Sequence, residues 1–206
     1  MADPRTEILG RIRRALADRP AAKEIPRDYD LSRPIDDLPG LFAARVADYR
    51  AGVRRVATPD LPATITEVLR LRGASPMVVP PDVPASWCVP GIDWHVDDED
   101  TPLPVATLDE AAGVLTGCAL AIAETGTIVL DAGPEQGRRA LTLIPDYHLC
   151  VVRTEQIVGT VPEALATLDP LRPLTFISGP SATSDIELNR VEGVHGPRTL
   201  EVLLTG

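Results

Sequence analysis

The sequence is short of aromatic residues, of cysteines and of long apolar runs. Only 3% of the 206 residues are aromatic, while 44% are hydrophobic, so aliphatic side chains must fill the core, as they do in sheets covered by helices. The three cysteines, at positions 88, 118 and 150, are far apart and include no C-x-x-C pair. They indicate neither a disulfide framework nor a zinc site, and they favour a reducing compartment.

No segment approaches the roughly 20 consecutive apolar residues that span a bilayer. Residues 1–14 are polar and charged, and they lack the apolar core of a signal peptide. The formal net charge of −10 repels the phosphates of nucleic acids and of anionic lipids. We therefore expect a cytoplasmic protein that binds neither a nucleic acid nor a membrane.

The common enzyme fingerprints are absent as well. The sequence has no glycine-rich dinucleotide motif and no Walker A loop. It also has no G-x-S-x-G turn and no H-E-x-x-H helix. These absences exclude the enzyme classes that are most easily recognised from sequence.

Helix and strand patterns alternate from about residue 60. We expect helices at residues 62–72, 107–116, 135–144 and 161–168, and short strands at 77–79 and 92–96. Further apolar runs are nearly continuous, which is typical of strands covered on both faces, at residues 119–123, 127–130, 149–152 and 174–177. A last strand is expected at 200–204, nearer an edge because it contains Glu201.

This alternation predicts an α/β fold, with a Rossmann-like, mostly parallel sheet flanked by helices. Only three residues separate the runs 119–123 and 127–130, so they should form a hairpin or a sharply bent strand. Residues 1–55 are expected to form an N-terminal helical arm and linker, with helices at 6–17 and near 40–52. Residues 56–206 are expected to form the α/β domain.

Glu124 is the only charged residue in the apolar run 121–130. A carboxylate that loses its solvation can serve as an acid, a base or a nucleophile, so Glu124 is a candidate catalytic residue. Its neighbours Thr125, Gly126 and Thr127 are candidate ligand contacts. Alternatively, Glu124 lies at the exposed tip of a hairpin and is only solvated.

A hydroxyl-rich loop follows the run 174–177. A loop beyond the carboxyl end of a strand and before a helix is a typical anion site. The candidate catalytic carboxylate is Asp185, and the candidate ligand contacts are Ser178, Gly179, Pro180, Ser181, Thr183 and Ser184. Alternatively, Ser184 and Glu187 form a helix capping box, and the acidic residues there would oppose an anion.

The turn before the last strand adds three candidates. His195 could donate or accept a proton near neutral pH, and Gly196 and Arg198 could contact a ligand. Alternatively, His195 is a solvated loop residue. Arg138 and Arg139 could hold a phosphate or carboxylate through paired hydrogen bonds, or they could lie on a solvated helix face.

Together these segments resemble the lactate utilization protein C family, which is also called the LUD-domain family. The matching segments, in the family's order, are ILGRIRRAL (8–16), AETGTIVLD (123–131), ALTLIPDYHLCVV (140–152), ISGPSATSDIE (177–187) and GVHGPRTLEVLL (193–204).

The resemblance implies a fold related to ribose-5-phosphate isomerase, glucosamine-6-phosphate deaminase and the CoA transferases. It also implies a role in bacterial L-lactate utilization, the oxidation of lactate to pyruvate, with two companion iron–sulfur proteins. On this basis we expect iron–sulfur centres only in the partners, no cofactor in this chain, and a small carboxylate as the ligand.

One position departs from the family pattern. The family often has a basic residue at position 182, where this chain has Ala182, so a bound anion would rely on Arg138 or Arg198 instead. The sequence leaves open whether the chain is catalytic. It could be a subunit or ligand-binding component. Alternatively, it is an enzyme that acts on a small carboxylate or a CoA or phosphate ester through Glu124, or a metabolite sensor without turnover.

Overall fold

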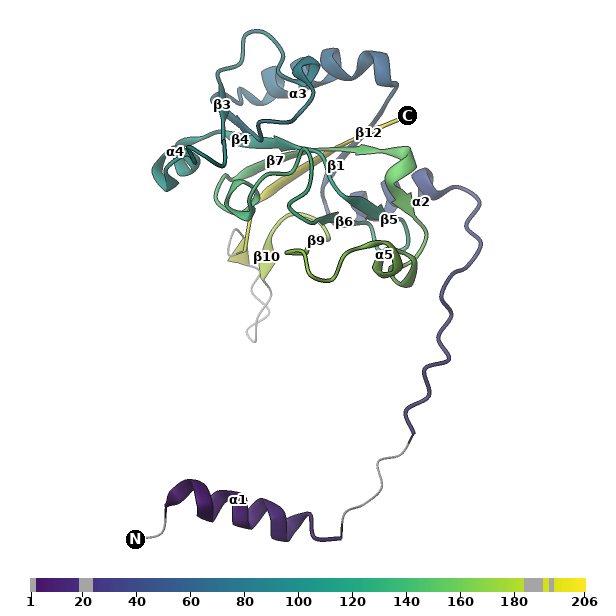
Figure 1. Cartoon of the computed structure of the whole chain (residues 1–206). Helices are drawn as coiled ribbons and strands as arrows, with labels where there is room; N and C mark the ends of the chain where they lie inside the picture. Colours follow the sequence, from purple (N-terminus) through teal and green to yellow (C-terminus); the bar gives the residue numbers. More distant parts are fainter. Residues whose placement is uncertain (1–2, 19–23, 184–190, 193–194) are drawn as a thin grey trace. The chain divides into compact units, whose positions relative to one another are not determined.

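The computed structural model describes residues 3–18, 24–183, 191–192 and 195–206 (Figure 1). The chain divides into two compact units, residues 1–30 and 31–206. In the first unit, the Asp3 carboxylate caps α1 (Pro4–Ala15), and none of the helix residues is buried. This division differs from the boundary expected at residue 55, because α2 (Leu38–Asp48) and β1 (Gly52–Val56) belong to the second unit.

The second unit contains a six-stranded sheet in which all neighbouring strands are parallel. The strands, in spatial order, are β1, β12 (Thr199–Thr205), β7 (Tyr147–Arg153), β4 (Gly113–Thr116), β2 (Met77–Val79) and β3 (Trp94–Val96). The expected parallel α/β sheet is thereby confirmed, with the runs 77–79, 149–152 and 200–204 as three of its strands.

Three other runs lie in a second sheet, which corrects the expectation that they are central strands of the parallel sheet. This sheet consists, in spatial order, of β8 (Ile157–Val158), β5 (Leu120–Ile122), β6 (Thr127–Leu130) and β9 (Thr175–Ile177). The β5–β6 hairpin is confirmed, and β9 also pairs antiparallel with β6. Both faces of β5 and β6 are covered, which explains their apolar runs, and burial on both faces does not require parallel pairing. In β9, Phe176 is 46% exposed.

The two sheets and their helices form layers. The face of the six-stranded sheet that carries Leu149 and Leu203 packs against α3 (Leu61–Arg72). Its other face packs against α2 and the second sheet, which lie on the side opposite α3 in Figure 1. The outer face of the second sheet is covered by α5 (Val161–Thr167). The helix α4 (Val105–Glu110) packs beside β2 and β4. The strands β10 (Ala182–Thr183) and β11 (Val191–Glu192) form an antiparallel hairpin. The described residues also form the short 3-10 turns η1 (Thr58–Asp60), η2 (Ala85–Trp87), η3 (Arg139–Thr142) and η4 (Thr154–Gln156).

Two expected helices are wrong. The segment 107–116 contains the end of α4 and then β4, where Gly113 allows close approach to Tyr147 of β7. The segment 135–144 contains only η3, because Glu135 and Gly137 both have a positive φ, which an α-helix does not allow. The strand β1 was not expected either, because the two arginines in GVRRV mask its apolar pattern.

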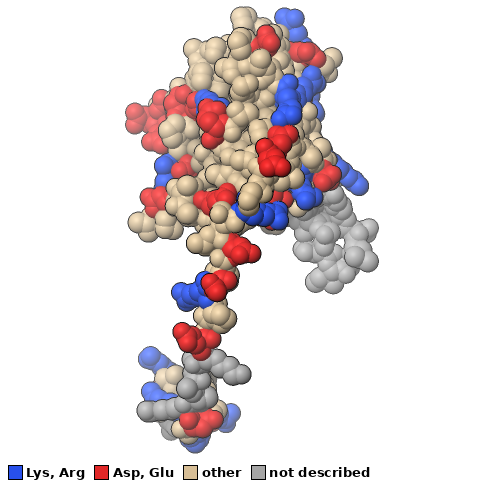
Figure 2. Space-filling model, turned by 90° about the vertical axis from the view of Figure 1, so that its right-hand side faces the viewer, with Lys and Arg blue, Asp and Glu red and all other residues tan. Residues whose placement is uncertain are grey.

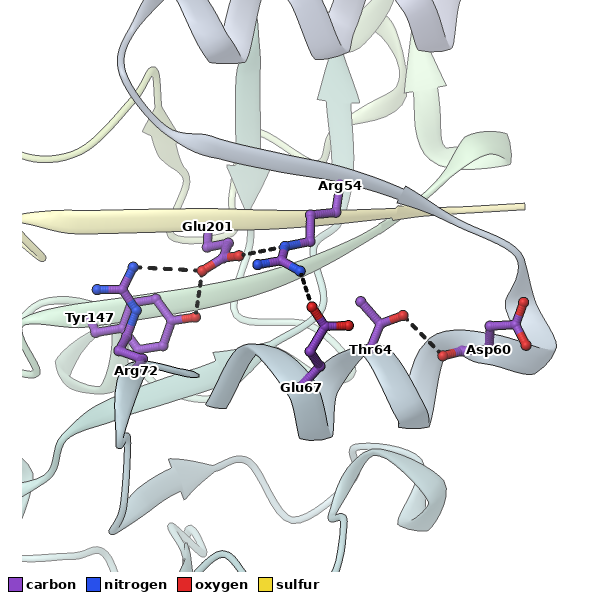
Figure 3. A network of polar contacts seen from close by, with 7 residues as sticks. All are labelled: Arg54, Asp60, Thr64, Glu67, Arg72, Tyr147 and Glu201. Carbon is purple, nitrogen blue, oxygen red and sulfur yellow. Dashed lines mark hydrogen bonds and ion pairs between the residues drawn. The ribbon is translucent and has the colours of Figure 1, made fainter. Parts of the chain in front are cut away.

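A polar network explains how β12 tolerates Glu201 one strand in from the edge (Figure 3). Glu201 Oε1 accepts a 3.2 Å hydrogen bond from Arg54 Nε, and Oε2 accepts one of 3.2 Å from the Tyr147 hydroxyl. The Arg72 guanidinium lies 4.3 Å from the centre of the Tyr147 ring and 3.6 Å from Glu201. Burial and the charge of Glu201 raise the pKa of Tyr147, so the phenol stays a donor.

Gly126 is required by the way the β5–β6 hairpin meets α2. Its φ is +60°, and a Cβ atom there would lie 2.7 Å from Cβ of Arg45 and 2.9 Å from the backbone nitrogen of Val46. We expect Gly126→Ala to lower the free energy of unfolding by at least about 2 kcal/mol in urea denaturation. Gly73→Ala is the matched control, because Gly73 has φ +63° but open space around it, so it should cost only about 1 kcal/mol. Equal losses would mean that contact with α2 is unimportant.

Charged side chains of both signs are intermingled on the face shown in Figure 2, without a single basic patch. The helices within the described ranges are all too short or too polar to cross a bilayer.

Candidate functional site

Two motif loops meet at a cavity of about 230 Å³. The first loop follows β9, and the second precedes β12, so the cavity lies between the two sheets at the start of β7 and β12. The residues that line it are Arg139, Thr142, His148, Thr175, Phe176, Ile177, Ser178, Gly179, Pro180, Ser181, His195, Gly196, Pro197 and Leu200.

The position of the first loop corrects one expectation. The anion site was expected beyond the carboxyl ends of the parallel strands, but the cavity lies at the amino ends of β7 and β12, where His148 and Leu200 are the second residues. The reason is that the loop leaves β9, a strand of the second sheet, and then leads into the start of β12.

Among the described residues that line the cavity, Arg139 is the one that carries a guanidinium. Its Nη1 donates to Thr142 Oγ1 and its Nη2 to the carbonyl oxygen of His195, both at 3.2 Å. Within the described ranges it forms no ion pair with a carboxylate. Partial burial without such a partner lowers the pKa of Arg139, although a guanidinium stays charged at neutral pH. It therefore has N–H donors to offer to an anion.

His148 forms part of the cavity wall from β7. It is almost completely buried, and its Nε2 lies 2.8 Å from Thr116 Oγ1. The Thr116 hydroxyl donates its single proton to the carbonyl oxygen of Gly117, also at 2.8 Å. Nε2 of His148 is therefore the donor to Thr116, which leaves the lone pair on Nδ1. No local signal in the sequence singles out His148, which stands at the start of an apolar strand.

The two loops are joined by hydrogen bonds. The backbone N–H of His195 donates to Ser181 Oγ at 3.0 Å, and the N–H of Ser181 donates to the carbonyl oxygen of Pro197 at 2.8 Å. A tight approach also fixes the first loop, because Gly179 has φ +85° and no room for a Cβ atom beside Tyr49. His195 itself is exposed, so its imidazole can reach solvent and a ligand at the cavity mouth.

The structure brings together most of the loop candidates. Ser178, Gly179, Pro180, Ser181, His195 and Gly196 all line the cavity. Thr127 reaches it through Ser178, since their hydroxyl oxygens are 2.8 Å apart, and Thr125 in turn lies 2.7 Å from Thr127. Thr183 lies in β10. Ser184 and Asp185, and the capping box with Glu187, lie outside the described residues.

Glu124 lies in the β5–β6 turn and is not one of the lining residues. Its carboxylate forms a 2.8 Å ion pair with Arg33, and about a third of its side chain is exposed, 34%. Its backbone N–H donates to the carbonyl oxygen of Gly159. The carboxylate is thus neither buried in apolar surroundings nor merely solvated.

Arg138 and Arg198, the arginines named as substitutes for a basic residue at position 182, are both engaged by carboxylates. Arg138 donates through Nε and Nη2 to the buried Asp97, both at 2.8 Å. Arg198 donates to both oxygens of Asp146 at 2.6 Å, which lowers the pKa of Asp146. Arg139, which the sequence grouped with Arg138, is the arginine at the cavity instead.

The described residues contain no group of three or more His, Cys, Asp or Glu side chains that could hold a metal ion. Cys118 and Cys150 are buried in the core between the sheets, as expected for small apolar side chains.

Comparison with known proteins places this fold in a family. A family model described as the LUD domain matches residues 106–205. Lactate utilization protein C of Deinococcus radiodurans is 48% identical to this chain, over 100% of the chain and 97% of that protein. The chain belongs to the lactate utilization protein C family. The resemblance seen in the motifs is therefore confirmed.

Two further relatives agree with this assignment. A lactate utilization protein C of a Geobacillus species is 30% identical over 67% of this chain and 65% of that protein. The crystal structure of a DUF162 family protein from Deinococcus radiodurans covers 84% of this chain and 100% of that chain, with 42% identity and a TM-score of 0.70. All residues that line the cavity lie within the matched LUD domain, whereas α1, α2 and β1 precede it.

Proposed function

We propose that this protein binds a small carboxylate, with lactate and pyruvate as the first candidates, as a component of bacterial L-lactate utilization. The observation that carries the proposal is the guanidinium of Arg139, which stands at a cavity with imidazoles and hydroxyls and has no described carboxylate partner. The names of the relatives supply the pathway.

The chemistry of the cavity suits such a ligand. A planar guanidinium binds a carboxylate through paired hydrogen bonds. The C2 hydroxyl of lactate can donate to Nδ1 of His148, and the C2 carbonyl oxygen of pyruvate can accept a hydrogen bond from the hydroxyl of Ser178 or Ser181. A cavity of about 230 Å³ is smaller than the roughly 300–1,000 Å³ of sites for drug-sized ligands, which favours a small metabolite.

In this proposal the chain carries no iron–sulfur centre and works with two iron–sulfur proteins, which take up the electrons when lactate becomes pyruvate. The number of cysteines supports this assignment, because an iron–sulfur cluster is typically held by four cysteine thiolates and the sequence has three.

Growth on L-lactate as sole carbon source tests the pathway. We expect deletion of the gene to slow growth on lactate but not on glucose, and the intact gene to restore growth on lactate.

Direct binding is tested by the melting temperature of the purified chain. A ligand present at about 100 times its Kd adds about 2.7 kcal/mol of stability and therefore raises the melting temperature. Normal growth of the deletion strain on lactate, without a paralogue, would contradict the pathway, and no shift with millimolar pyruvate or lactate would contradict the site.

The alternative, an enzyme with Glu124 as acid, base or nucleophile, makes a different prediction. We expect Glu124→Gln to keep ligand binding and growth on lactate, and to cost at most about 1 kcal/mol of stability, because both side chains of the pair with Arg33 are partly exposed. Arg33→Gln is the matched control, since it removes the same ion pair and keeps the carboxylate. If folded Glu124→Gln fails to support growth while Arg33→Gln supports it, the carboxylate itself is needed and the enzyme alternative gains.

A further inference from the structure

A second cavity adjoins the first at Arg139. Its volume is about 280 Å³, and it lies where β6 ends and β9 begins. It shares Arg139, Thr142 and Thr175 with the first cavity. Its other lining residues have no polar side chain: they are Leu130, Ala132, Gly137, Pro173 and Leu174.

The two cavities differ in chemistry. The first offers imidazoles and serine hydroxyls, while the second offers aliphatic groups and proline. Both have η3 as part of their wall, since Arg139 and Thr142 belong to that turn. The bond from Arg139 Nη2 to the carbonyl oxygen of His195 directs the guanidinium toward the polar cavity. A carboxylate bound by Arg139 therefore lies beside a polar space on one side and an apolar space on the other.

We propose that the apolar cavity is a side-chain subsite, and that the site takes 2-hydroxy and 2-oxo carboxylates whose aliphatic chain is longer than the methyl group of lactate. This inference rests on the proposed function, because it assumes that Arg139 binds the carboxylate. The C2 atom of such an acid carries a carboxylate, an oxygen and an alkyl chain. The carboxylate would bind to Arg139, the C2 oxygen would lie in the polar cavity, and the alkyl chain would lie in the apolar cavity.

The length of the alkyl chain should decide the affinity. The methyl group of pyruvate fills little of a space of about 280 Å³. Each methylene that moves from water into the apolar cavity should tighten binding about three- to fourfold, until the cavity is full. Branched chains of similar length should follow the same trend, because a hydrophobic contact has no preferred direction.

The experiment is a calorimetric titration of the full chain with pyruvate, 2-oxobutanoate, 2-oxopentanoate and 2-oxohexanoate. We expect the Kd to fall by at least tenfold from the first acid to the last. Leu174→Trp and Ala132→Phe narrow the apolar cavity from two sides, and either should flatten the series to within about twofold. Leu171→Trp is the matched control: Leu171 is 92% exposed in the same connection and does not line the cavity, so the series should keep its slope.

The outcomes separate this inference from the proposed function. If all four acids bind with one Kd, and Arg139→Gln weakens them all, the carboxylate site stands and the apolar subsite is wrong. If the series keeps its slope in both Leu174→Trp and Ala132→Phe, the chain lies elsewhere and the inference is also overturned. If no acid binds, or if Arg139→Gln changes nothing, the proposed function fails together with the inference.

Discussion

Replacement of Arg139 by glutamine should weaken pyruvate binding by at least about tenfold. Hydrogen bonds to a charged group contribute about 1.5–3 kcal/mol, which corresponds to a factor of about 10–150 in Kd. The fold should be unaffected, because the described bonds of Arg139 join it only to the Thr142 hydroxyl and a carbonyl oxygen, so no buried carboxylate is left unpaired. Isothermal titration of the purified variant, with its melting temperature as a check on folding, measures both effects.

Two further variants make this test specific. Arg139→Lys keeps the positive charge but loses the planar, bidentate geometry, so its Kd should lie between those of wild type and Arg139→Gln. Arg70→Gln removes a charge from the exposed surface of α3, which covers the opposite face of the parallel sheet, and should leave the Kd within about twofold. If Arg139→Gln binds pyruvate as tightly as Arg70→Gln does, Arg139 is not the carboxylate ligand.

The sequence identified the two loops of the cavity and named Arg139 among several candidate arginines, but it did not single out Arg139. The loops around Ser178 and His195 stand out because hydroxyls, glycines and a histidine cluster there. The choice among the arginines depends on carboxylates that are distant in the sequence. Asp97 is 41 positions from Arg138, and Asp146 is 52 positions from Arg198. No local pattern predicts such pairs, so the arginine without a carboxylate partner in the described residues emerges only from the structure.

The same reasoning explains which strands were predicted. The run 149–152 is a central parallel strand, as its continuous apolar pattern suggested, and the run 200–204, expected nearer an edge because of Glu201, lies one strand in from the edge. The runs that became β5 and β6 have the same pattern in an antiparallel hairpin, because apolar continuity reports burial on both faces and is silent on strand direction. The strand β1 was missed because the charge of Arg54 conceals it, and that charge is balanced by Glu201, 147 residues later.

Replacement of Glu201 by alanine should lower the free energy of unfolding by about 2–3 kcal/mol, which is the second large effect that we expect. Removing one partner of a buried ion pair costs about 3–5 kcal/mol. The cost should be smaller here, because Arg54 and Arg72 are 38% and 40% exposed and can turn toward water once the carboxylate is gone. The Tyr147 hydroxyl cannot do so, because it is buried beneath α3 and would lose its acceptor. For a chain of this size the melting temperature should fall by about 4–12 °C.

Glu67→Ala is the matched control, because Glu67 forms a 3.0 Å ion pair with the same Arg54 (Figure 3). Its side chain is 60% exposed, against 10% for Glu201, so its removal should cost less than about 1 kcal/mol. Glu201→Gln keeps an acceptor for Tyr147 without the charge and should fall between the two alanine variants. If urea denaturation gives equal losses for Glu201→Ala and Glu67→Ala, burial adds nothing to this network. The charge of Glu201 would then add no stability to the fold, and the pairing of β1 with β12 would depend on backbone hydrogen bonds and apolar packing alone.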